Sequence, residues 1–595
     1  MVWDPVTFTL HVESDELLDQ HTRYGLIVTR AVKDINRDPV EATTDFRYFL
    51  AVSLWDQWWR GGDYGTTLLD AMGGARRAGV GGREVVSASV FTTQSVTAIL
   101  EKIRGQIKAA TPASADFKLG PGGTRTVFAL NDVVSVVNNQ QTGDNPPRFT
   151  PVSLGPPRDS AGIGQVAFGK YLSPDYEVHP GEYIPPVGTL SGVPEVRATN
   201  EIYFNLFLPT RPKPPGGWPV AIFGHGANGS KNLSLFVAGS VAGQGIAMIA
   251  VNAVGHDFGP QGTMTVTLSN GNSGTFPSGG RGRDQNGDGA IGTNEGVGAA
   301  RPRNVINTRD GLRQTVVDMI QLVRVIESGI DIDGDGSRDL DPSRIYYVGS
   351  SMGGFDGTIL TPLEPSVRAA VLTVAGGPSV HIGRLSSVNR PGIGTGLASR
   401  VPSLLNAPGI TELNGVPVSG PFFNENIPLR NQPPVINTVA GAMEIQALFE
   451  NREWVQQSGD PVAYARYIRR DPLPGMAAKP VIFQFAKGDQ TVPNPGTTAL
   501  LRAGDLTDRA TYYRHDLAFA TNPTLPTNPH SFMLTFATPS TADIARTAQR
   551  QIAIFFASDG LEVIDPDGPE QPDGTGRLFE VPIVPPLPEE LNFIP

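Results

Sequence analysis

The sequence contains no cysteine. This absence excludes disulfide bonds, thiolate metal sites and a cysteine nucleophile. An excess of positive charge is also missing, since the formal net charge is −11, so we expect neither nucleic acid nor an anionic membrane as a partner. No apolar run approaches the roughly 18 to 20 residues of a transmembrane segment, and residues 1–4 lack the charged-then-apolar order of a signal peptide.

The chain is rich in turn-forming residues, with 69 glycines and 52 prolines among 595 residues. This length predicts more than one packed unit. Alternating apolar and polar residues in 1–48 predict strands, which we interpret as a partial immunoglobulin-like β region. Residues 49–115 have a mainly helical pattern, broken by a strand-like segment at 84–93, and residues 116–200 form a β-rich connecting region.

Residues 201–560 alternate between apolar strand-like runs, loops and helical patterns. This rhythm is typical of an α/β domain with a mostly parallel sheet and helices on both faces. The predicted strands lie at 218–223, 245–254, 345–348, 367–374 and 480–485.

A segment at 379–475 interrupts the alternation. It is rich in proline and glycine and then predicts a helix over 435–449. Because ligands bind at the carboxyl ends of the strands in open α/β sheets, we expect this insertion to form a cap there. The tail, 561–595, is rich in proline and acidic residues and is expected to run extended over the surface.

Gly349-Ser350-Ser351-Met352-Gly353 matches the pattern G-x-S-x-G and follows the apolar run 345–348. A very tight strand-to-helix turn needs small residues on both sides of a nucleophilic serine. In a chain this rich in glycine the pattern alone is weak, but its position between a strand and a helix favours Ser351 as a nucleophile. Ser350 would have the bulkier Val348 and Met352 in the flanking positions.

A serine hydroxyl needs a base to take its proton. In α/β-hydrolases, whose serine motif this one resembles, the acid and then the histidine come later in the chain than the serine, which leaves His381, His515 and His530. His530 lies in a loop before the last helix and is the predicted base, with His515 as the alternative. Asp489 follows the run 480–485 and is the predicted acid.

Gly224-His225-Gly226-Ala227 follows the apolar run 218–223 and has no bulky side chains after its histidine. Such a loop can bring a backbone N–H close to the negative oxygen of a tetrahedral intermediate. We therefore predict the N–H groups of Ala227 and Met352 as the oxyanion hole, with His225 bracing the loop.

Two Asp-rich loops predict structural calcium. The loop 284–295 has the complete EF-hand pattern, and the loop 331–339 has the same opening but Pro342 at position 12. Asp and Gly turns without metal are the alternative for both. The predicted ligands are Asp284, Asn286, Asp288, Ala290 through its carbonyl, Glu295, Asp331, Asp333, Asp335 and Asp339.

The combination of His225-Gly226, the run 309–314, the Asp-rich loop that leads to 345–354, Gly488-Asp489 and Asn528-Pro529-His530 resembles bacterial secreted α/β-hydrolase lipases and esterases. These include the surface-exposed lipase/lysophospholipase group, whose hydrolase domain follows an Ig-like N-terminal region. Residues of about 200 to 560 carry the resemblance, and the first 200 residues resemble that group only loosely. The signal or lipoprotein cysteine of the group is absent here.

The resemblance implies hydrolysis of carboxylic esters through an acyl-enzyme, with calcium as a stabiliser and no cofactor in the chemistry itself. We expect a hydrophobic or lipid-like ester as the substrate. A serine peptidase of the same fold and a non-catalytic calcium-dependent adhesion protein are the alternatives. Because EF-hand-type loops fill at extracellular millimolar calcium, we expect a secreted or cell-surface protein, with the cytoplasm as the alternative.

Overall fold

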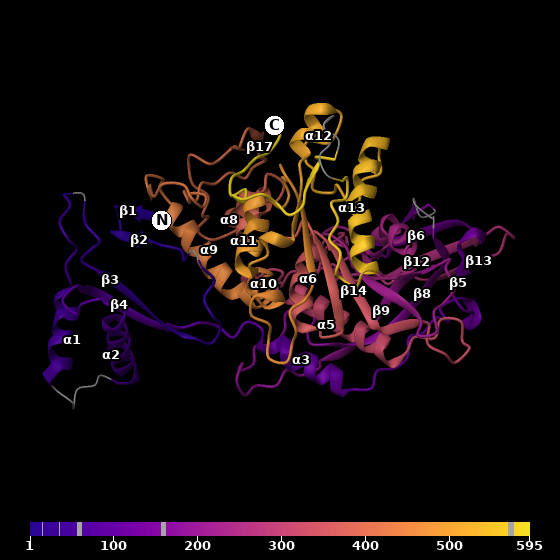
Figure 1. The fold of residues 1–595 in the computed structure, drawn as a ribbon, viewed down its shortest axis with the longest axis horizontal. Helices are drawn as coiled ribbons and strands as arrows, with labels where there is room; N and C mark the ends of the chain where they lie inside the picture. The colour runs from indigo at the N-terminus through magenta and orange to yellow at the C-terminus, as the bar shows by residue number, and fades with distance from the viewer. Residues whose placement is uncertain (15, 35, 56–61, 156–161, 569–575) are drawn as a thin grey trace. The chain divides into compact units, whose positions relative to one another are not determined.

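The computed structural model describes the chain except residues 15, 35, 56–61, 156–161 and 569–575. The described residues form two compact units. The larger unit comprises Met1–Glu13 and Thr97–Pro595, and the smaller comprises Ser14–Val96. Figure 1 shows the fold coloured along the chain.

A ten-stranded sheet forms the centre of the larger unit, in the order β21-β20-β19-β15-β14-β10-β11-β9-β8-β5. The six strands from β20 to β11 run parallel, and the other four pair antiparallel. This is the mostly parallel α/β sheet that the sequence predicts. The strands are β5 (Val127–Ala129), β8 (Ile163–Asp175), β9 (Ala198–Pro209), β10 (Trp218–Gly224), β11 (Ala247–Val251), β14 (Leu340–Ser350), β15 (Val367–Thr373), β19 (Val481–Ala486), β20 (Ala510–Tyr513) and β21 (Phe579–Glu580).

Helices cover both faces of this sheet (Figure 1). Successive side chains of a strand point to opposite faces. In β14 the ring of Tyr346 stacks on Phe556 of α13 at 5.0 Å between centroids, whereas the hydroxyl of Tyr347 donates to the carbonyl of Gly353 in α6. The helices of these layers are α3 (Ala98–Ala109), α4 (Ala238–Ala242), α5 (Arg309–Ser328), α6 (Met352–Leu363), α10 (Val462–Arg469), α11 (Asn494–Gly504), α12 (His515–Thr521) and α13 (Pro539–Ala557).

A second, antiparallel sheet has the order β13-β12-β6-β7. Its buried side chains Met264, Val266 and Phe276 join the same apolar layer as α4 and α13. The second sheet therefore extends the cover on that face of the central sheet. Its strands are β6 (Val133–Gly143), β7 (Arg148–Ser153), β12 (Gly259–Leu268) and β13 (Ser273–Pro277).

The insertion between β15 and β19 has a small hydrophobic core of its own. Ile445 and Phe449 of its long helix, α9, pack into this core. The helix prediction over 435–449 was wrong at its start, because residues 435–436 pair with β1 as β18 and α9 begins only after Gly441. Besides α10, the insertion contains α7 (Ser379–Leu385), α8 (Arg390–Ala398), α9 (Ala442–Gln456), β16 (Glu412–Leu413), β17 (Val416–Pro417) and β18 (Val435–Ile436).

The strands of residues 1–48 belong to two separate sheets, which differs from the single partial immunoglobulin-like β region that the sequence predicts. β1 and β2 form a three-stranded sheet with β18, whereas β3 pairs with β4 in the smaller unit, where α2 contacts both strands. Alternation identifies strands, but it does not select their partners. The elements are β1 (Val2–Asp4), β2 (Thr9–His11), β3 (Arg23–Thr29), β4 (Val85–Thr92), α1 (Thr44–Trp55) and α2 (Gly62–Arg77).

The described part of the tail does more than run over the surface. β21 adds an antiparallel edge strand to the central sheet, and its Phe579 is buried in the main apolar layer. Phe593 is buried with Leu413 and Val418 of the insertion. Apolar residues spaced along the proline-rich sequence thus attach the tail to two parts of the fold. No helix in the described residues is long and apolar enough to cross a membrane.

Candidate active site

Ser351 lies at a sharp corner between β14 and α6. Its backbone has φ 57° and ψ −118°, a conformation that residues other than glycine rarely adopt. The Ser351 N–H donates to the Thr373 carbonyl at 2.9 Å, and the Ser351 carbonyl accepts from Phe355 N–H at 3.0 Å. The neighbouring strand and the first turn of the helix therefore hold the serine in a strained conformation, as is frequent at functional sites.

The glycines on both sides of Ser351 allow close backbone packing at this corner. A Cβ atom built on Gly349 would overlap the backbone of Gly353, and one on Gly353 would overlap the backbone of Gly224 in β10. The glycine requirement of the motif is thus a matter of space between β14, α6 and the neighbouring strand.

His530 joins Ser351 and Asp489 by hydrogen bonds. The Ser351 hydroxyl lies 2.9 Å from Nε2 of His530, and Nδ1 of the same ring lies 2.8 Å from Oδ2 of Asp489. When the serine donates to Nε2, the ring proton is on Nδ1 and is donated to the carboxylate. The structure thus brings together the three side chains that the sequence singles out, with the predicted base between the predicted nucleophile and the predicted acid.

Asp489 is almost completely buried, and hydrogen bonds to both of its carboxylate oxygens fix the orientation of its side chain. Oδ1 accepts from the N–H groups of Thr491 and Val492 at 2.8 and 2.9 Å, which leaves Oδ2 for the histidine. Three hydrogen bonds to an ionised carboxylate compensate for its removal from water. The loop after β19 therefore presents a fixed, ionisable acceptor to His530.

Two asparagines that were given no role from the sequence hold these loops. Asn528 Oδ1 accepts from the N–H groups of Gln490 and His530, which connects the acid loop to the histidine loop. From the tail, Asn592 Oδ1 accepts from Gly488 N–H at 2.8 Å. Asn528, two residues before the histidine, could be suspected from its position, but nothing local marks Asn592.

The other two downstream histidines have different surroundings. His515 begins helix α12, shortly after β20 ends at Tyr513. Its Nε2 lies 2.8 Å from the carbonyl of Pro526, so it supports the loop that carries His530. His381 lies in α7 of the insertion.

The loop after β10 turns sharply next to Ser351. Gly229 N–H donates to the carbonyl of Gly226 at 3.0 Å, which places Ala227 within a tight turn. A Cβ on Gly226 would lie 3.2 Å from the Cβ of Ser351, so this loop is packed against the serine. Met352 begins α6, and its side chain packs with Ala253.

His225 braces this turn as a neutral ring. Its Nε2 accepts from the Ala253 N–H at 3.0 Å, so the proton is on Nδ1, which donates to the Gly226 carbonyl at 2.9 Å. Burial, together with His256 and nearby cations, lowers the pKa of His225 to about 3. The ring therefore connects the end of β11 to the turn that contains Ala227.

The first Asp-rich loop is connected to the same turn, because Thr293 donates to the side-chain oxygen of Asn228 at 2.9 Å. Within the loop, Asp284 accepts from the N–H groups of Gly287 and Gly289. The other predicted side-chain ligands accept backbone N–H groups of the same loop. Glu295 accepts from residues 285, 286 and 292, Asn286 accepts from Asp288, and Asp288 accepts from Ala290.

The second Asp-rich loop fits a cation better than the first. Oxygens of Asp331, Asp333 and Asp335 lie within 4.8 Å of one another, whereas the acidic side chains of the first loop, all of which the structure describes, form no such group. Asp339 lies outside this group. Its Oδ1 accepts from Lys213 at 2.6 Å and its Oδ2 from Ile332 N–H.

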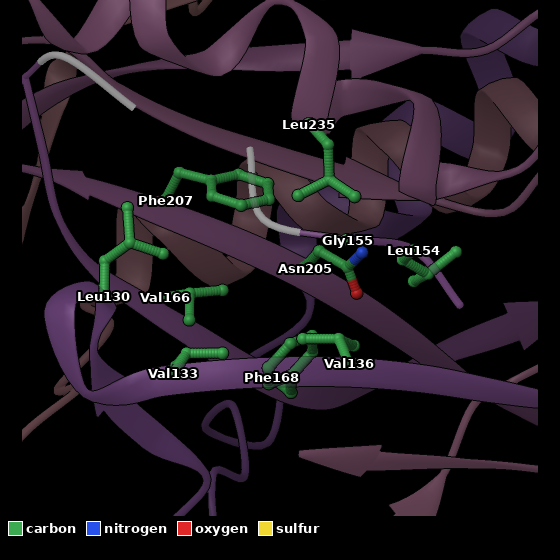
Figure 2. Close-up of a pocket in the computed structure, with 10 residues that line it drawn as sticks. All are labelled: Leu130, Val133, Val136, Leu154, Gly155, Val166, Phe168, Asn205, Phe207 and Leu235. Carbon is green, nitrogen blue, oxygen red and sulfur yellow. The ribbon is translucent and has the colours of Figure 1, made fainter. Parts of the chain in front are cut away.

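An apolar pocket in the described part of the chain lies away from these residues (Figure 2). Strands of both sheets form it, and neither Ser351, Asp489 nor His530 is among its lining residues. Its apolar lining is Leu130, Val133, Val136, Leu154, Val166, Phe168, Phe207 and Leu235, with Gly155 and Asn205.

No family model matches this chain, and no curated protein matches it. Several solved structures are similar at low identity. An esterase from Pyrobaculum calidifontis has 13% identity and a TM-score of 0.31, with 61% of this chain and 83% of that chain covered. An acetyl xylan esterase from Paenibacillus sp. R4 has 13% identity and a TM-score of 0.32, with 72% and 94% covered. A Pyrococcus horikoshii acylaminoacyl peptidase has 12% identity and a TM-score of 0.32, with 60% and 39% covered.

Proposed function

We propose that the protein is a serine hydrolase that cleaves carboxylic esters through an acyl-enzyme on Ser351. The observation that carries the proposal is the pair of hydrogen bonds, 2.9 and 2.8 Å long, that link Ser351, His530 and Asp489. A serine on a strained corner, a histidine with an available Nε2 and a buried acid are the groups that nucleophilic catalysis requires.

In the proposed cycle, Ser351 Oγ adds to the ester carbonyl while His530 Nε2 takes its proton. The N–H groups of Ala227 and Met352 stabilise the negative oxygen. The protonated ring then gives its proton to the leaving alcohol as the C–O bond breaks, and Asp489 stabilises the imidazolium. Water attacks the acyl-enzyme by the same route and releases the acid and the free serine.

Inhibition by a fluorophosphonate probe tests the nucleophile. We expect labelling of the intact protein and its loss in Ser351→Ala, with turnover of a chromogenic ester reduced by about 10⁶-fold. Ser350→Ala is the matched control, because it removes the adjacent hydroxyl and should leave the labelling unchanged. Labelling that persists in Ser351→Ala would identify another nucleophile, and an unlabelled wild type would favour a calcium-dependent binding protein.

Ester and peptide substrates separate the esterase from the peptidase. The sequence has no regular repeat of 40 to 50 residues that would form a propeller gate, as in some peptidases of this kind. We therefore expect turnover of esters and not of a peptide amide. A panel of esters with increasing acyl length would then define the preference. Turnover of the amide alone would overturn the ester assignment.

We further propose structural calcium, held in the second loop by Asp331, Asp333 and Asp335. The support is the convergence of their oxygens within 4.8 Å, a distance that one cation can bridge. Bound calcium would offset two of the three clustered negative charges just before β14, which leads to Ser351. For the first loop the support is its sequence pattern and its link to Asn228. Secretion or a cell-surface location belongs to this proposal, since such loops fill at extracellular calcium.

A further inference from the structure

The most unusual polar cluster outside the active site follows β8. Asp175 ends the strand, and Glu177 and His179 come next in the chain. An oxygen from each carboxylate and a ring nitrogen of the histidine lie within 4.8 Å of one another. In contrast to the Asp-rich loops, the two acidic side chains are about 98% buried or more.

Hydrogen bonding explains only part of this cluster. His179 lies between two carboxylates, with Nε2 3.0 Å from Oδ2 of Asp175 and Nδ1 3.4 Å from Oε1 of Glu182. Glu177 contributes a third carboxylate, and among the described residues its buried Oε1 has no hydrogen-bond partner. A buried carboxylate oxygen without a donor is costly unless a proton or a cation compensates for it.

We propose that Asp175, Glu177 and His179 bind a divalent transition-metal cation of the zinc type. Ligands about 2.0 to 2.2 Å from one tetrahedral zinc ion lie roughly 3.4 Å apart. The 3.0 Å between His179 Nε2 and Asp175 Oδ2 is close to this separation, so a small shift lets a cation replace the shared proton. The imidazole ligand favours zinc over calcium or magnesium, which prefer oxygen ligands alone.

The surroundings favour a cation electrostatically. Three carboxylates surround one imidazole, so the ionised cluster has excess negative charge. One positive side chain near Glu177, that of Arg281, is engaged elsewhere, since it pairs with Asp318 at 2.7 Å. A cation would compensate the buried carboxylate without a bound proton.

Glu182 connects the proposed metal site to the first Asp-rich loop. Its Oε1 faces the second ring nitrogen of His179, a common arrangement around metal-bound histidines. Its Oε2 accepts from Gln285 at 2.7 Å in the first Asp-rich loop, whose Thr293 holds Asn228 in the turn next to Ser351. The cation would therefore stabilise the loops on that side of the active site and take no part in ester cleavage.

Metal titration of the full chain tests the proposal. After removal of metals with a chelator, we expect one equivalent of Zn²⁺ to bind the wild type and Co²⁺ to give a visible absorption band. Glu177→Gln, which keeps the shape but removes the charge, should weaken Zn²⁺ binding at least tenfold, and His179→Gln should do the same. Asp333→Asn is the matched control, because it alters the proposed calcium loop and should leave Zn²⁺ binding unchanged.

Zn²⁺ binding by Glu177→Gln with wild-type affinity would overturn the proposal. Should both variants fail to fold, as judged by circular dichroism, the wild type still decides, since binding of less than one equivalent of Zn²⁺ or a Co²⁺ complex without a visible band would overturn it. These measurements do not use ester turnover and are independent of the proposed hydrolase activity.

Discussion

The active-site corner and the second Asp-rich loop are built in opposite ways. His530 is 179 residues from Ser351 and 41 from Asp489, so its hydrogen bonds join distant parts of the chain. In the loop, Asp331 accepts from N–H groups three and five residues ahead. The corner therefore depends on the whole sheet and its loops, whereas the Asp-rich loop forms most of its geometry from its own residues.

This difference predicts that loss of a long-range contact at the corner has a larger effect on activity than a change in the Asp-rich loop. Asp489→Asn should lower kcat by about 10⁴-fold, because an amide at this position favours the wrong ring tautomer of His530. Steady-state kinetics on an ester would measure the loss. Asp505→Asn, an exposed residue outside the site, is the control and should keep wild-type kcat. A similar kcat for both variants would mean that Asp489 does not orient the base.

Close backbone packing at the corner should be the next most sensitive feature. Gly349→Ala places a methyl group against the Gly353 backbone, and we expect it to lower the free energy of unfolding by about 3 kcal/mol. Urea denaturation would measure this. At Gly392, a helical position with open space around it, the same substitution should have little effect. Equal stability of the two variants would show that the corner relaxes easily.

The contribution of His225 to the corner can be tested by varying the pH. Its pKa is about 3 in the fold against roughly 6.5 in an unfolded chain, so the unfolded state binds more protons between these values. Its contribution to stability is therefore present above pH 6.5 and is lost as the pH falls towards 3. His225→Gln should reduce this slope and, by loosening the turn at Ala227, lower kcat by up to about 100-fold.

Denaturation at several pH values and ester kinetics would measure both effects. His11→Gln is the control, because His11 lies far from Ser351 in the chain and its Nδ1 lies 3.2 Å from the exposed Glu450. An unchanged slope together with unchanged kcat in His225→Gln would remove the bracing role.

A change in the second Asp-rich loop should have the smallest effect on activity. If the second loop binds calcium, an excess of ten times the Kd stabilises the fold by about 1.4 kcal/mol, which raises the Tm by a few degrees. Asp333→Asn should reduce this calcium-dependent rise, while Asp505→Asn should keep it. Because no step of the proposed chemistry involves calcium, kcat should change much less than Tm. A Tm that is insensitive to thorough chelation would contradict the calcium assignment.

Features with a local cause were predictable from the sequence. The run before Ser351 is apolar and its glycines are small, so strand, turn and helix could be expected there. The start of α9 was missed because residues 435–436 pair with β1, more than 400 residues earlier in the chain. The tail was misjudged for the same reason, since Phe579 and Asn592 have roles that only their distant partners reveal.

The sequence by itself determined the order of α/β elements, the serine corner and the candidate acid and base, because periodicity, glycine spacing and chain order are local or one-dimensional properties. Only the tertiary structure decided which strands pair, that Asn528 and Asn592 hold the acid loop, and that Asp339 is engaged by Lys213. It also decided that Glu177 has a buried oxygen to which no group in the described part of the chain donates. Such facts depend on which distant groups meet and how much water they exclude, and no local pattern encodes either.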